Sequence, residues 1–417
     1  MKAGACDFRF SLFEASVGSN ILIAKGAFEG LGGSPRFQVC DGSERPIADE
    51  MLDSGHENFD HRAAFEYLVA WMRENYADRM ALSAVGHHIT HGGAECAEPT
   101  LLTPEVLQRL EALSSLAPRQ QRHNLAGVKA VSQVRPDLPQ IGCFDTAFHR
   151  GRSASAERFG LPDGLLTLGI RRWGFHGLSF ESVIKALGES APHLAAGRII
   201  VAYLGDSASL CAIQGGHSVD TTMSFSTLDG LPMATRCGSL DPDVILHLLR
   251  HMSADELETL LYEQSGLLGI SGISGDVRVL LASKDPRAAE AIDFLVYRIV
   301  SEIGSLTAAL GGLDALVFTA GIGVNSAAIR SRICRRLGWL GLALDPGANE
   351  RHERCVSFPG RSPSVWIIPS DEEQVIAAHT WKIVSLLPHR LSYWEEAADD
   401  CPFRENRAQG NHTLSTR

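Results

Sequence analysis

The sequence predicts an α/β protein in which strands and helices alternate along the chain. Three observations lead to this class: short apolar runs typical of buried strands, capped helical stretches between them, and a composition of 45% hydrophobic and 21% charged residues. A length of 417 residues favours two or three domains with sizeable cores.

The first segment predicts one half of a hairpin. Lys2–Ala5 is typical of a turn, and Asp7–Phe13 alternates polar and apolar residues with the period of two of a half-buried strand. The strand that should precede the turn is missing from the pattern.

The following elements alternate in type, and each has a local signal. Helices are predicted where an apolar period follows a cap, as in the capping box of Ser253 and Glu256. The predicted helices are Asp60–Asn75, Pro104–Leu113, Asp241–His251, Ser253–Gln264, Pro286–Leu310, Ser326–Leu337 and Asp371–Leu387. The predicted buried strands are Ile141–Phe144, Ile199–Leu204, Ala315–Thr319 and Val365–Ile368. A loop-like stretch at His149–Ala156 indicates a domain boundary near residue 150.

Composition and cysteine usage exclude several classes of protein. A net charge of −11 argues against a protein that wraps a nucleic acid duplex. Nine cysteines without a C-x-x-C pair argue against a disulfide framework and a zinc knuckle, and favour a reducing cytoplasm. No apolar run reaches the roughly 20 residues of a membrane helix, and the first 30 residues lack the pattern of an export signal. We therefore expect a cytoplasmic protein with no membrane or nucleic-acid partner.

Two strand ends carry candidate anion sites. Ile199–Leu204 runs into the tip Gly205–Ser209, where backbone N–H groups can face a phosphate, although most such tips are only hairpin turns. Ala315–Thr319 runs into the glycine turn Ala320–Ser326 before a helix N-terminus, where Asn325 or Ser326 can also act merely as a helix cap. The glycine spacing matches neither the Rossmann nor the Walker pattern.

Three further side chains are candidates for chemistry. Arg236 lies in a turn before a Pro-started helix and can bind phosphate oxygens or pair with Asp241 on the surface. His176 lies between glycines with aromatic neighbours, a context that suits either a structural histidine or a loop pressed against a ligand. Asp145 ends a buried strand, where a carboxylate commonly serves catalysis or caps the next turn.

The segment GHHITHGG at residues 86–93 does not predict a metal site. Its β-branched residues favour a strand, which would place His87 and His91 about 13 Å apart at ~3.3 Å per residue. The glutamate of an H-E-x-x-H motif is also absent.

Taken in order, these clusters resemble the acetate kinases, within the short-chain acyl kinases of the actin/hexokinase/Hsp70-like superfamily. The resemblance extends to about residue 387. The stretches that carry it are FDTAFH at 144–149, GIRRWGFHG at 169–177, SVDTTM at 218–223, ATRCGSLDP at 234–242, SGLLGISGISGDVR at 265–278 and LGGLDALVFTAGIG at 310–323.

The resemblance implies a fold, an assembly and a reaction. The fold is a two-domain actin/hexokinase-like (ribonuclease H-like) α/β fold with a cleft between the domains. Domain I comprises residues 1–150 and about 380–398, the nucleotide-binding domain II comprises residues 151–379, and residues 399–417 form a disordered tail. The implied protein is a cytoplasmic homodimer that uses Mg2+ and transfers phosphate reversibly between ATP and a short-chain carboxylate, giving acyl phosphate and ADP.

The resemblance also assigns roles to individual residues. Arg236 and His176 neutralise the phosphoryl oxygens, Asp145 orients the acceptor, and Glu372 lies near magnesium, whereas Glu373 has an alternative role in a Ser370-x-x-Glu373 capping box. The substrate-binding position is occupied by His88. The implied nucleotide-binding residues are Tyr203, Gly205, Asp206, Ser207, Asp276, Arg278, Gly321, Gly323 and Asn325.

Several positions depart from the family pattern. The phosphate loop N-x-G-S-S-S-x-K is replaced by K-A-G-A-C-D-F-R, which brings in Lys2, Asp7 and Arg9. His88 stands for an arginine, Asp206 and Ser207 replace N-G of the H-L-G-N-G loop, and Gln120-Gln121-Arg122 replaces H-N-P. Tyr203 replaces the histidine of that loop, and Val324 replaces a glutamate. The leading hypothesis is an acetate kinase-like enzyme for acetate or a similar short-chain acid. The alternative is a non-catalytic nucleotide-binding paralogue with a regulatory or binding role.

Overall fold

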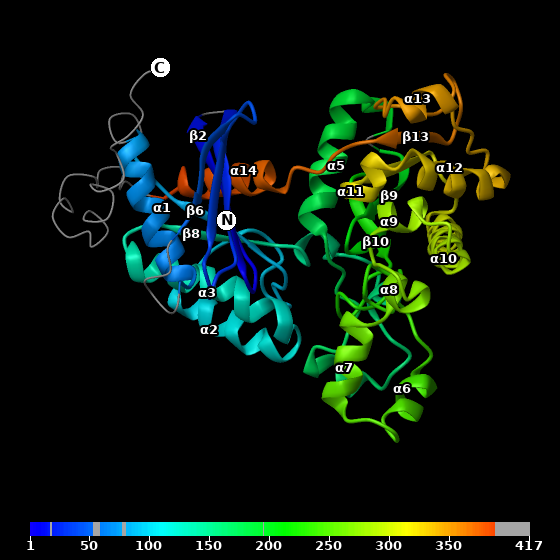
Figure 1. The fold of residues 1–417 in the computed structure, drawn as a ribbon, viewed down its shortest axis with the longest axis horizontal. Coiled ribbons are helices and arrows are strands. Elements are labelled where there is room, and N and C mark those ends of the chain that lie inside the picture. Colours follow the sequence, from blue (N-terminus) through cyan, green and yellow to red (C-terminus); the bar gives the residue numbers. More distant parts are fainter. Residues whose placement is uncertain (17–18, 53–58, 77–80, 195, 388–417) are drawn as a thin grey trace, which may run out of the picture. The chain divides into compact units, whose positions relative to one another are not determined.

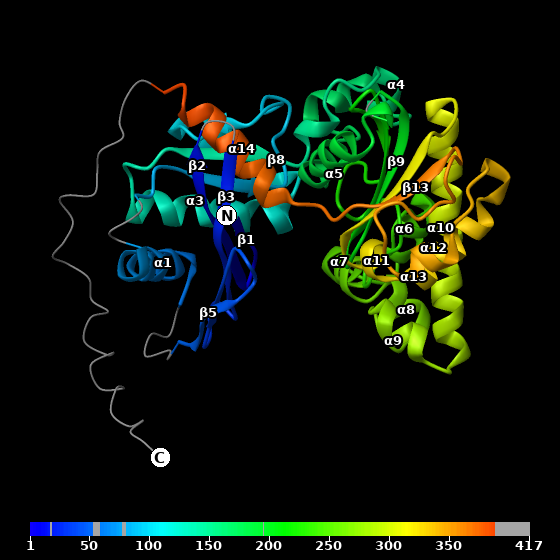
Figure 2. The same cartoon turned by 90° about the horizontal axis from the view of Figure 1, so that it is seen from above.

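A computed structural model describes residues 1–16, 19–52, 59–76, 81–194 and 196–387 (Figures 1 and 2). Contacts divide the chain into two compact units. Unit 1 comprises Met1–His87, His123–Ile141 and the chain from Thr380, and unit 2 comprises His88–Arg122 and Gly142–His379. The domain limits given above stay a prediction, and the segment 399–417 lies outside the described residues.

Unit 1 contains a five-stranded antiparallel sheet in the order β1-β2-β3-β4-β5. Its strands are β1 (Lys2–Ala3), β2 (Asp7–Ser16), β3 (Ser19–Glu29), β4 (Arg36–Asp41) and β5 (Pro46–Met51). The prediction of a turn at Lys2–Ala5 is therefore wrong in its first half, because Lys2 and Ala3 pair with Arg9 and Phe8. This segment is a hairpin with a very short first strand, β1. A strand of two residues is too short to show an alternating apolar pattern, so the sequence did not indicate it.

The core of unit 1 is aromatic. Phe8 and Phe10 of β2 are buried while Arg9 is exposed, so the predicted alternation places one face of the strand inward. Phe28 and Phe37 lie with their ring centroids 4.6 Å apart on neighbouring strands. Helix α1 (His61–Tyr76) covers this face of the sheet and buries a stripe of apolar side chains in the same cluster (Figure 2).

Unit 2 contains a second five-stranded sheet in the order β11-β10-β9-β12-β13. Its strands are β9 (Arg198–Leu204), β10 (Ala208–Gln214), β11 (His217–Thr221), β12 (Ala315–Thr319) and β13 (Ser364–Ile367). The central strands β9, β12 and β13 run parallel. Ile199 and Val201 of β9 pack on the face that carries α5 (Gly177–Ser190), and Ile200 and Ala202 pack on the face that carries α10 (Pro286–Leu310) (Figure 2). Both faces are buried, which explains the continuous apolar runs of these strands.

Shorter helices and a small sheet complete the described fold. The remaining helices are α2 (Pro104–Ala112), α3 (Pro118–Val134), α4 (Ala154–Glu157), α6 (Pro242–Leu248), α7 (Ala254–Glu263), α8 (Gly266–Ser271), α9 (Val277–Ala282), α11 (Ala320–Asn325), α12 (Ala327–Arg336), α13 (Pro346–Glu350) and α14 (Glu372–Val384). A three-stranded sheet has the order β6-β8-β7, formed by β6 (Val85–Ile89), β8 (Gln140–Phe144) and β7 (Thr100–Leu101).

The predicted helices and buried strands are all present. The largest differences are at the C-terminal ends of α6 and α14, which stop at Leu248 and Val384 rather than at His251 and Leu387. The glycine turn predicted at Ala320–Ser326 is instead the short helix α11, because Asn325 Nδ2 donates to Gly321 O at 2.9 Å and closes the turn.

None of the helices in the described ranges combines the length and the hydropathy of a membrane span. Every cysteine in the described ranges is a free thiol, as the absence of paired spacing predicts.

Candidate active site

The N-terminus of α5 is the centre of the candidate site. His176 immediately precedes the helix in the left-handed conformation, with φ 59°. Gly177 follows it because a Cβ there would lie 2.0 Å from the carbonyl oxygen of Asp145, so the helix start can approach the end of β8 only without a side chain. The glycine that flanks the histidine thus brings His176 and Asp145 together.

The imidazole of His176 has a fixed orientation. Its Nδ1 lies 2.7 Å from Ser209 Oγ and its Nε2 lies 3.1 Å from Ser207 Oγ. The ring stacks on Tyr203 with a centroid distance of 4.1 Å. Burial, followed by the negative charges of Glu372 and Asp145, raises the pKa of the Tyr203 hydroxyl, which therefore stays protonated and neutral. His176 is held by the tip between β9 and β10, and the tip is thus part of the site.

Asp145, His88 and Glu372 meet beside the same helix start. His88 Nε2 lies 2.9 Å from Asp145 Oδ2, and His88 Nδ1 lies 3.7 Å from Glu372 Oε2. The side chains of His88 and Asp145 are nearly inaccessible to solvent. The other carboxylate oxygen of Asp145 lies 3.5 Å from the backbone N–H of Leu178, in the first turn of α5. A helix N-terminus favours negative charge, so the first turn of α5 is a favourable place for the Asp145 carboxylate.

Glu372 is linked to α5 by a direct contact. The hydroxyl of Ser179 donates to Glu372 Oε1. The alternative capping box with Ser370 and Glu373 is wrong, because α14 begins at Glu372 and Asp371 Oδ1 accepts the hydrogen bond from Gln374 N at 2.9 Å. The carboxylate of Glu372 thus remains directed at the site.

Arg236 lies in the loop between β11 and α6. Its guanidinium donates to Thr227 O at 3.2 Å and lies over the ring of Tyr262. Among the described residues it forms no ion pair, so the surface pair with Asp241 is wrong, and Asp241 instead caps α6. Burial lowers the pKa of Arg236, which nevertheless remains charged as arginines do in proteins. A half-buried cation without an acidic partner is suited to an anionic ligand.

The loop of Arg236 is held by the start of α8. The backbone N–H groups of Ser265, Leu267 and Leu268 donate to the carbonyls of residues 235, 233 and 234 at 2.9 Å each. These bonds join two stretches that are separated in the sequence: Met233 and the start of ATRCGSLDP supply the carbonyls, and SGLLGISGISGDVR supplies the amides.

The two strand ends that predicted anion sites lie at one edge of the sheet. β9 and β12 are parallel neighbours, so their carboxyl ends coincide. A Cβ at Gly205 would lie 3.5 Å from Ala320 Cβ, which places the tip next to α11. The side chains of Asp206 and Asn325 are exposed at this edge. Gly321 and Gly323 lie in α11, and Ser326 caps α12 through Ile329 N, as its alternative role predicted.

A small, mostly apolar pocket joins the predicted nucleotide-binding segments. Its lining includes Gly205, Ala234, Leu267, Gly275 and Ile322, which come from the tip, the Arg236 loop, α8, the start of α9 and α11. Such walls suit the flat face of a nucleobase or its ribose. The pocket therefore links four segments that the sequence analysis named separately.

Asp276 and Arg278 follow this pocket at the start of α9. Asp276 caps the helix through Arg278 N, and the two side chains form an ion pair of 2.6 Å. The Arg278 guanidinium beside it holds the pKa of Asp276 below its usual range. Arg278 is 91% exposed, so its charge is accessible to a ligand.

Sequence reasoning missed two residues of the site. Ser209 is fully buried and orients His176, and Ser179 binds Glu372. A signal for Ser209 existed, since it is a polar residue inside the apolar run of β10, but nothing in the local pattern of α5 indicates that Ser179 faces a carboxylate.

The model of the acetokinase family matches residues 1–378. The chain belongs to the acetokinase family. The resemblance stated from the motifs is therefore confirmed.

Curated relatives and solved structures in the acetokinase family agree. The acetate kinase of Rhodopseudomonas palustris is 47% identical over 390 residues, which cover 92% of this chain and 97% of that protein. The acetate kinase of Nitrobacter hamburgensis is 44% identical over 94% of this chain and 96% of that protein. The crystal structure of Porphyromonas gingivalis acetate kinase matches with a TM-score of 0.82 at 30% identity, covering 92% of this chain and 98% of that one. A propionate kinase structure from Francisella tularensis matches with a TM-score of 0.84 at 30% identity, covering 91% and 98%. The predicted fold class is confirmed by these matches.

Proposed function

We propose that this protein is an acetate kinase-like phosphotransferase. It transfers the terminal phosphoryl group of ATP to the carboxylate of acetate or a similar short-chain acid, and the reaction is reversible. The observation that carries the proposal is the convergence of His176, Asp145 and Glu372 at the N-terminus of α5. The relatives named acetate kinase and the similar propionate kinase structure support an acyl acceptor of this size.

The reaction needs positioning and charge rather than acid–base chemistry. A carboxylate oxygen of the acceptor attacks the phosphorus, the new O–P bond forms, and the bond to ADP breaks, with the negative charge leaving on ADP. Neither bond change requires a proton from the protein. Catalysis therefore depends on cations and hydrogen-bond donors placed around the transferring group.

Each residue of the site has a role in this step. Arg236 meets the phosphoryl oxygens with two parallel N–H groups, which no acidic side chain of the described chain occupies. His176 Nε2 exchanges the Ser207 hydroxyl for a phosphoryl oxygen, and its Nδ1 keeps the contact with Ser209. Asp145, held by His88, orients the acceptor and keeps its carboxylate in line with the phosphorus.

The nucleotide lies along the edge of the unit 2 sheet. The tip residues Tyr203, Gly205, Asp206 and Ser207 face its phosphates, and Asp276, Arg278, Gly321, Gly323 and Asn325 surround the adenosine. The pocket beside Gly205 and Ile322 supports this placement.

The donor set fits magnesium. Mg2+ prefers oxygen ligands and is often held by one or two carboxylates together with substrate phosphates. Glu372 supplies a carboxylate beside the N-terminus of α5, with its Oε2 3.7 Å from His88 Nδ1, and it would hold the ion. Bound magnesium would supply charge neutralisation between the phosphates, and His88, Asp145 and Arg236 would act as described above.

Assembly and location complete the proposal. The resemblance to the family implies a homodimer, and light scattering coupled to size-exclusion chromatography tests it. The free thiols of the described chain suit the reducing cytoplasm.

A hydroxamate assay tests the function. Purified protein receives Mg-ATP with acetate, propionate or butyrate, and acyl phosphate is trapped with hydroxylamine. We expect turnover with at least one acid and its loss in Arg236→Ala, whereas Arg250→Ala, which removes an exposed arginine two residues beyond α6, leaves turnover intact. A folded protein that makes no hydroxamate with any of the three acids would contradict the kinase and leave the non-catalytic nucleotide-binding paralogue.

A further inference from the structure

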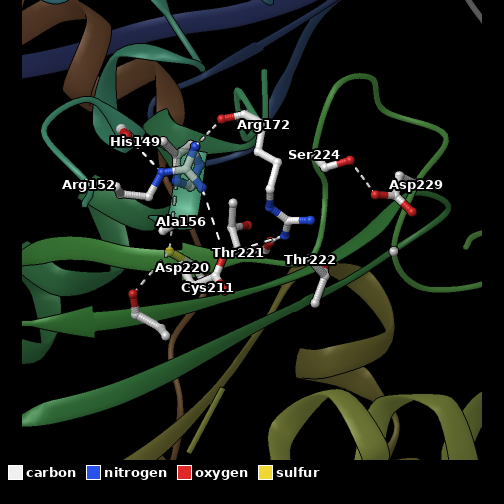
Figure 3. Close-up of polar contacts among 12 residues, drawn as sticks. His149, Arg152, Ala156, Arg172, Cys211, Asp220, Thr221, Thr222, Ser224 and Asp229 are labelled. Atoms are coloured by element: carbon white, nitrogen blue, oxygen red, sulfur yellow. Dashed lines mark hydrogen bonds and ion pairs between the residues drawn. The ribbon is translucent and has the colours of Figure 1, made fainter. Parts of the chain in front are cut away.

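The turn that follows β8 contains a buried arginine outside the roles given above. The side chain of Arg152 is only 1% exposed. Its Nε donates to His149 O at 3.0 Å, and its Nη2 donates to Trp173 O at 2.9 Å and to Arg172 O (Figure 3). Most of its donors are thus used on backbone carbonyls, two of which belong to the loop that leads to His176.

His149, from the same turn, holds the next part of that loop. Its Nε2 lies 2.9 Å from Phe175 O and its Nδ1 lies 2.9 Å from Ser218 Oγ. Burial lowers the pKa of His149 to about 3, so the ring is neutral, and a carbonyl can only accept, which assigns the proton to Nε2. The ring packs on Gly174, where a Cβ would lie 2.5 Å from His149 Cγ.

Ser224 holds the loop from the other side. Its carbonyl accepts from Trp173 N at 2.8 Å and from Gly174 N at 3.2 Å. The carbonyls of residues 172, 173 and 175 and the amides of residues 173 and 174 therefore all have partners. The next residue is His176, whose left-handed backbone needs such support because a residue with a side chain disfavours it.

The same contacts continue to the loop of Arg236. The hydroxyl of Ser224 donates to Asp229 Oδ2 (Figure 3). Ser239 Oγ donates to Asp229 Oδ1 at 2.6 Å. Ser239 Oγ also accepts from Gly230 N at 3.1 Å. Asp229 thus closes the base of the loop from 230 to 239, which carries Arg236.

The charge of Arg152 is not explained by an ion pair. Its Nη1 has no hydrogen-bond partner among the described residues and lies 3.9 Å from Asp220 Oδ1, which Arg172 approaches more closely at 3.4 Å. A buried cation without a close acid is costly, and an apolar side chain of the same length would fill the space at less cost. What the guanidinium adds is a rigid fork that fixes several carbonyls at once.

We propose that Arg152, His149 and Asp229 form a polar frame that positions His176 and Arg236 relative to each other, with Arg152 as its principal positioning residue. The proposal rests on the proposed function, since both positioned side chains act on the phosphoryl group there. A displacement of about 1 Å of a catalytic group can cost on the order of a hundredfold in rate, so a frame of this kind is a determinant of turnover.

The test compares Arg152→Met with Arg158→Met. Both replace an arginine by an apolar side chain of similar length, but Arg158 is about half exposed and forms a surface ion pair with Asp163. For Arg152→Met we expect kcat to fall about 30- to 100-fold while KM for ATP and for the acid stays within about threefold, because binding groups are retained and their alignment is lost. Arg158→Met should behave like the wild type.

Hydrogen exchange supplies a readout that does not need turnover. In Arg152→Met the amides of residues 172–176 should exchange at least about tenfold faster, while those of β2, β3 and β4 in unit 1 stay unchanged. Arg152→Lys keeps the charge without the fork and should recover part of kcat and little of the protection.

A double-mutant cycle tests whether the frame is continuous. Asp229→Asn alone should lower kcat about tenfold. In the double mutant with Arg152→Met, the fold-loss in kcat should be smaller than the product of the two single losses, because either change already loosens the same frame. If the fold-loss in kcat of the double mutant equals the product of the two single losses, Arg152 and Asp229 act independently, and the proposal of one frame is wrong.

Other outcomes also decide the proposal. Unchanged kcat in a folded Arg152→Met protein, or unchanged exchange at residues 172–176, refutes the positioning role. A loss of kcat that comes with faster exchange throughout unit 2 assigns Arg152 to general stability and refutes it as well. Should the wild type itself make no acyl phosphate, the proposed function fails, and the exchange of residues 172–176 still decides whether Arg152 holds the loop.

Discussion

The turn between β1 and β2 in unit 1 and the loop before α5 in unit 2 are both family motifs, yet they are held very differently. In the turn, Gly4 N donates to Asp7 O at 2.9 Å and His61 Nε2 lies 2.9 Å from Gly4 O, while Cys6 is exposed and Asp7 pairs with Arg9 at the surface. In the loop, the backbone groups from 172 to 175 are bound by buried side chains and by Ser224.

The exposure of the turn explains why it can depart from the family pattern, whereas the departure at the buried His88 has another cause. Exposed side chains in a turn can change without loss of stability, so K-A-G-A-C-D-F-R can replace the phosphate loop and leave the hairpin intact. The motif GIRRWGFHG is retained because a change there would leave buried polar groups without partners. The retained motif GIRRWGFHG therefore has dense backbone contacts that the turn lacks, and four predictions probe that difference.

The largest effect is expected from His176→Ala in the retained loop. Loss of a donor to the phosphoryl group should lower kcat about 100- to 1,000-fold, as for other donors to a developing charge. The hydroxamate assay measures it, with His217→Ala as the control because His217 is an exposed histidine of β11. If His176→Ala keeps turnover within about threefold of the wild type, the retained loop does not supply a catalytic residue through His176.

The second effect is a loss of stability in acid, which we expect to come from the buried histidines His149 and His87. Burial lowers the pKa of His149 in unit 2 to about 3 and of His87 in unit 1 to about 3, whereas the unfolded value is near 6.5. The unfolded state therefore binds more protons below pH 6.5, so the stabilisation is present above that pH and is lost as pH falls towards 3.

The expected size is about 2 kcal/mol for each histidine between pH 7 and pH 5. Urea unfolding at both pH values measures it, and His149→Gln and His87→Gln should each reduce the pH dependence by that amount. If a variant and the wild type show the same pH dependence of the free energy of unfolding, the replaced histidine does not have a lowered pKa in the folded protein, and this prediction is wrong.

A smaller effect is expected from His88, which replaces an arginine of the family pattern. His88→Ala removes the donor from Asp145 Oδ2 and should lower kcat about tenfold, because the acceptor-orienting carboxylate loses its hold. His88→Gln, which can still donate to Asp145, should recover part of the activity. Equal activity of the alanine and glutamine variants would argue against a role through Asp145.

The smallest effect is expected in the exposed turn. Asp7→Ser removes a negative charge from the segment that resembles the family's phosphate loop, so turnover should rise about threefold. Its side chain is 38% exposed and forms a surface ion pair with Arg9, so thermal stability should not change. A loss of activity would indicate that Asp7 contributes to the reaction, so that this turn, like the loop before α5, would carry catalytic chemistry.

Sequence patterns determined the local elements and the motif residues of this protein. The apolar runs of β9 and β12, the capping box of α7 and the position of Asp145 after β8 are encoded within a few residues, because periodicity and caps act locally. The strands β3 and β5 escaped prediction, since the pairing skips Ile23 of β3 opposite Leu12/Phe13 and Ile47 of β5 opposite Val39/Cys40, which shifts the alternation.

Only the tertiary structure decided which side chains meet. Ser179 binds Glu372 across a separation of 193 residues, and His88 meets Asp145 across 57. Arg152 reads from the sequence as one more charged residue of a loop, and its burial against the carbonyls of residues 172 and 173 depends on the folding of β8, β10 and β11 around it. Contacts of this kind are set by the packing of distant segments, which no pattern of neighbouring residues records.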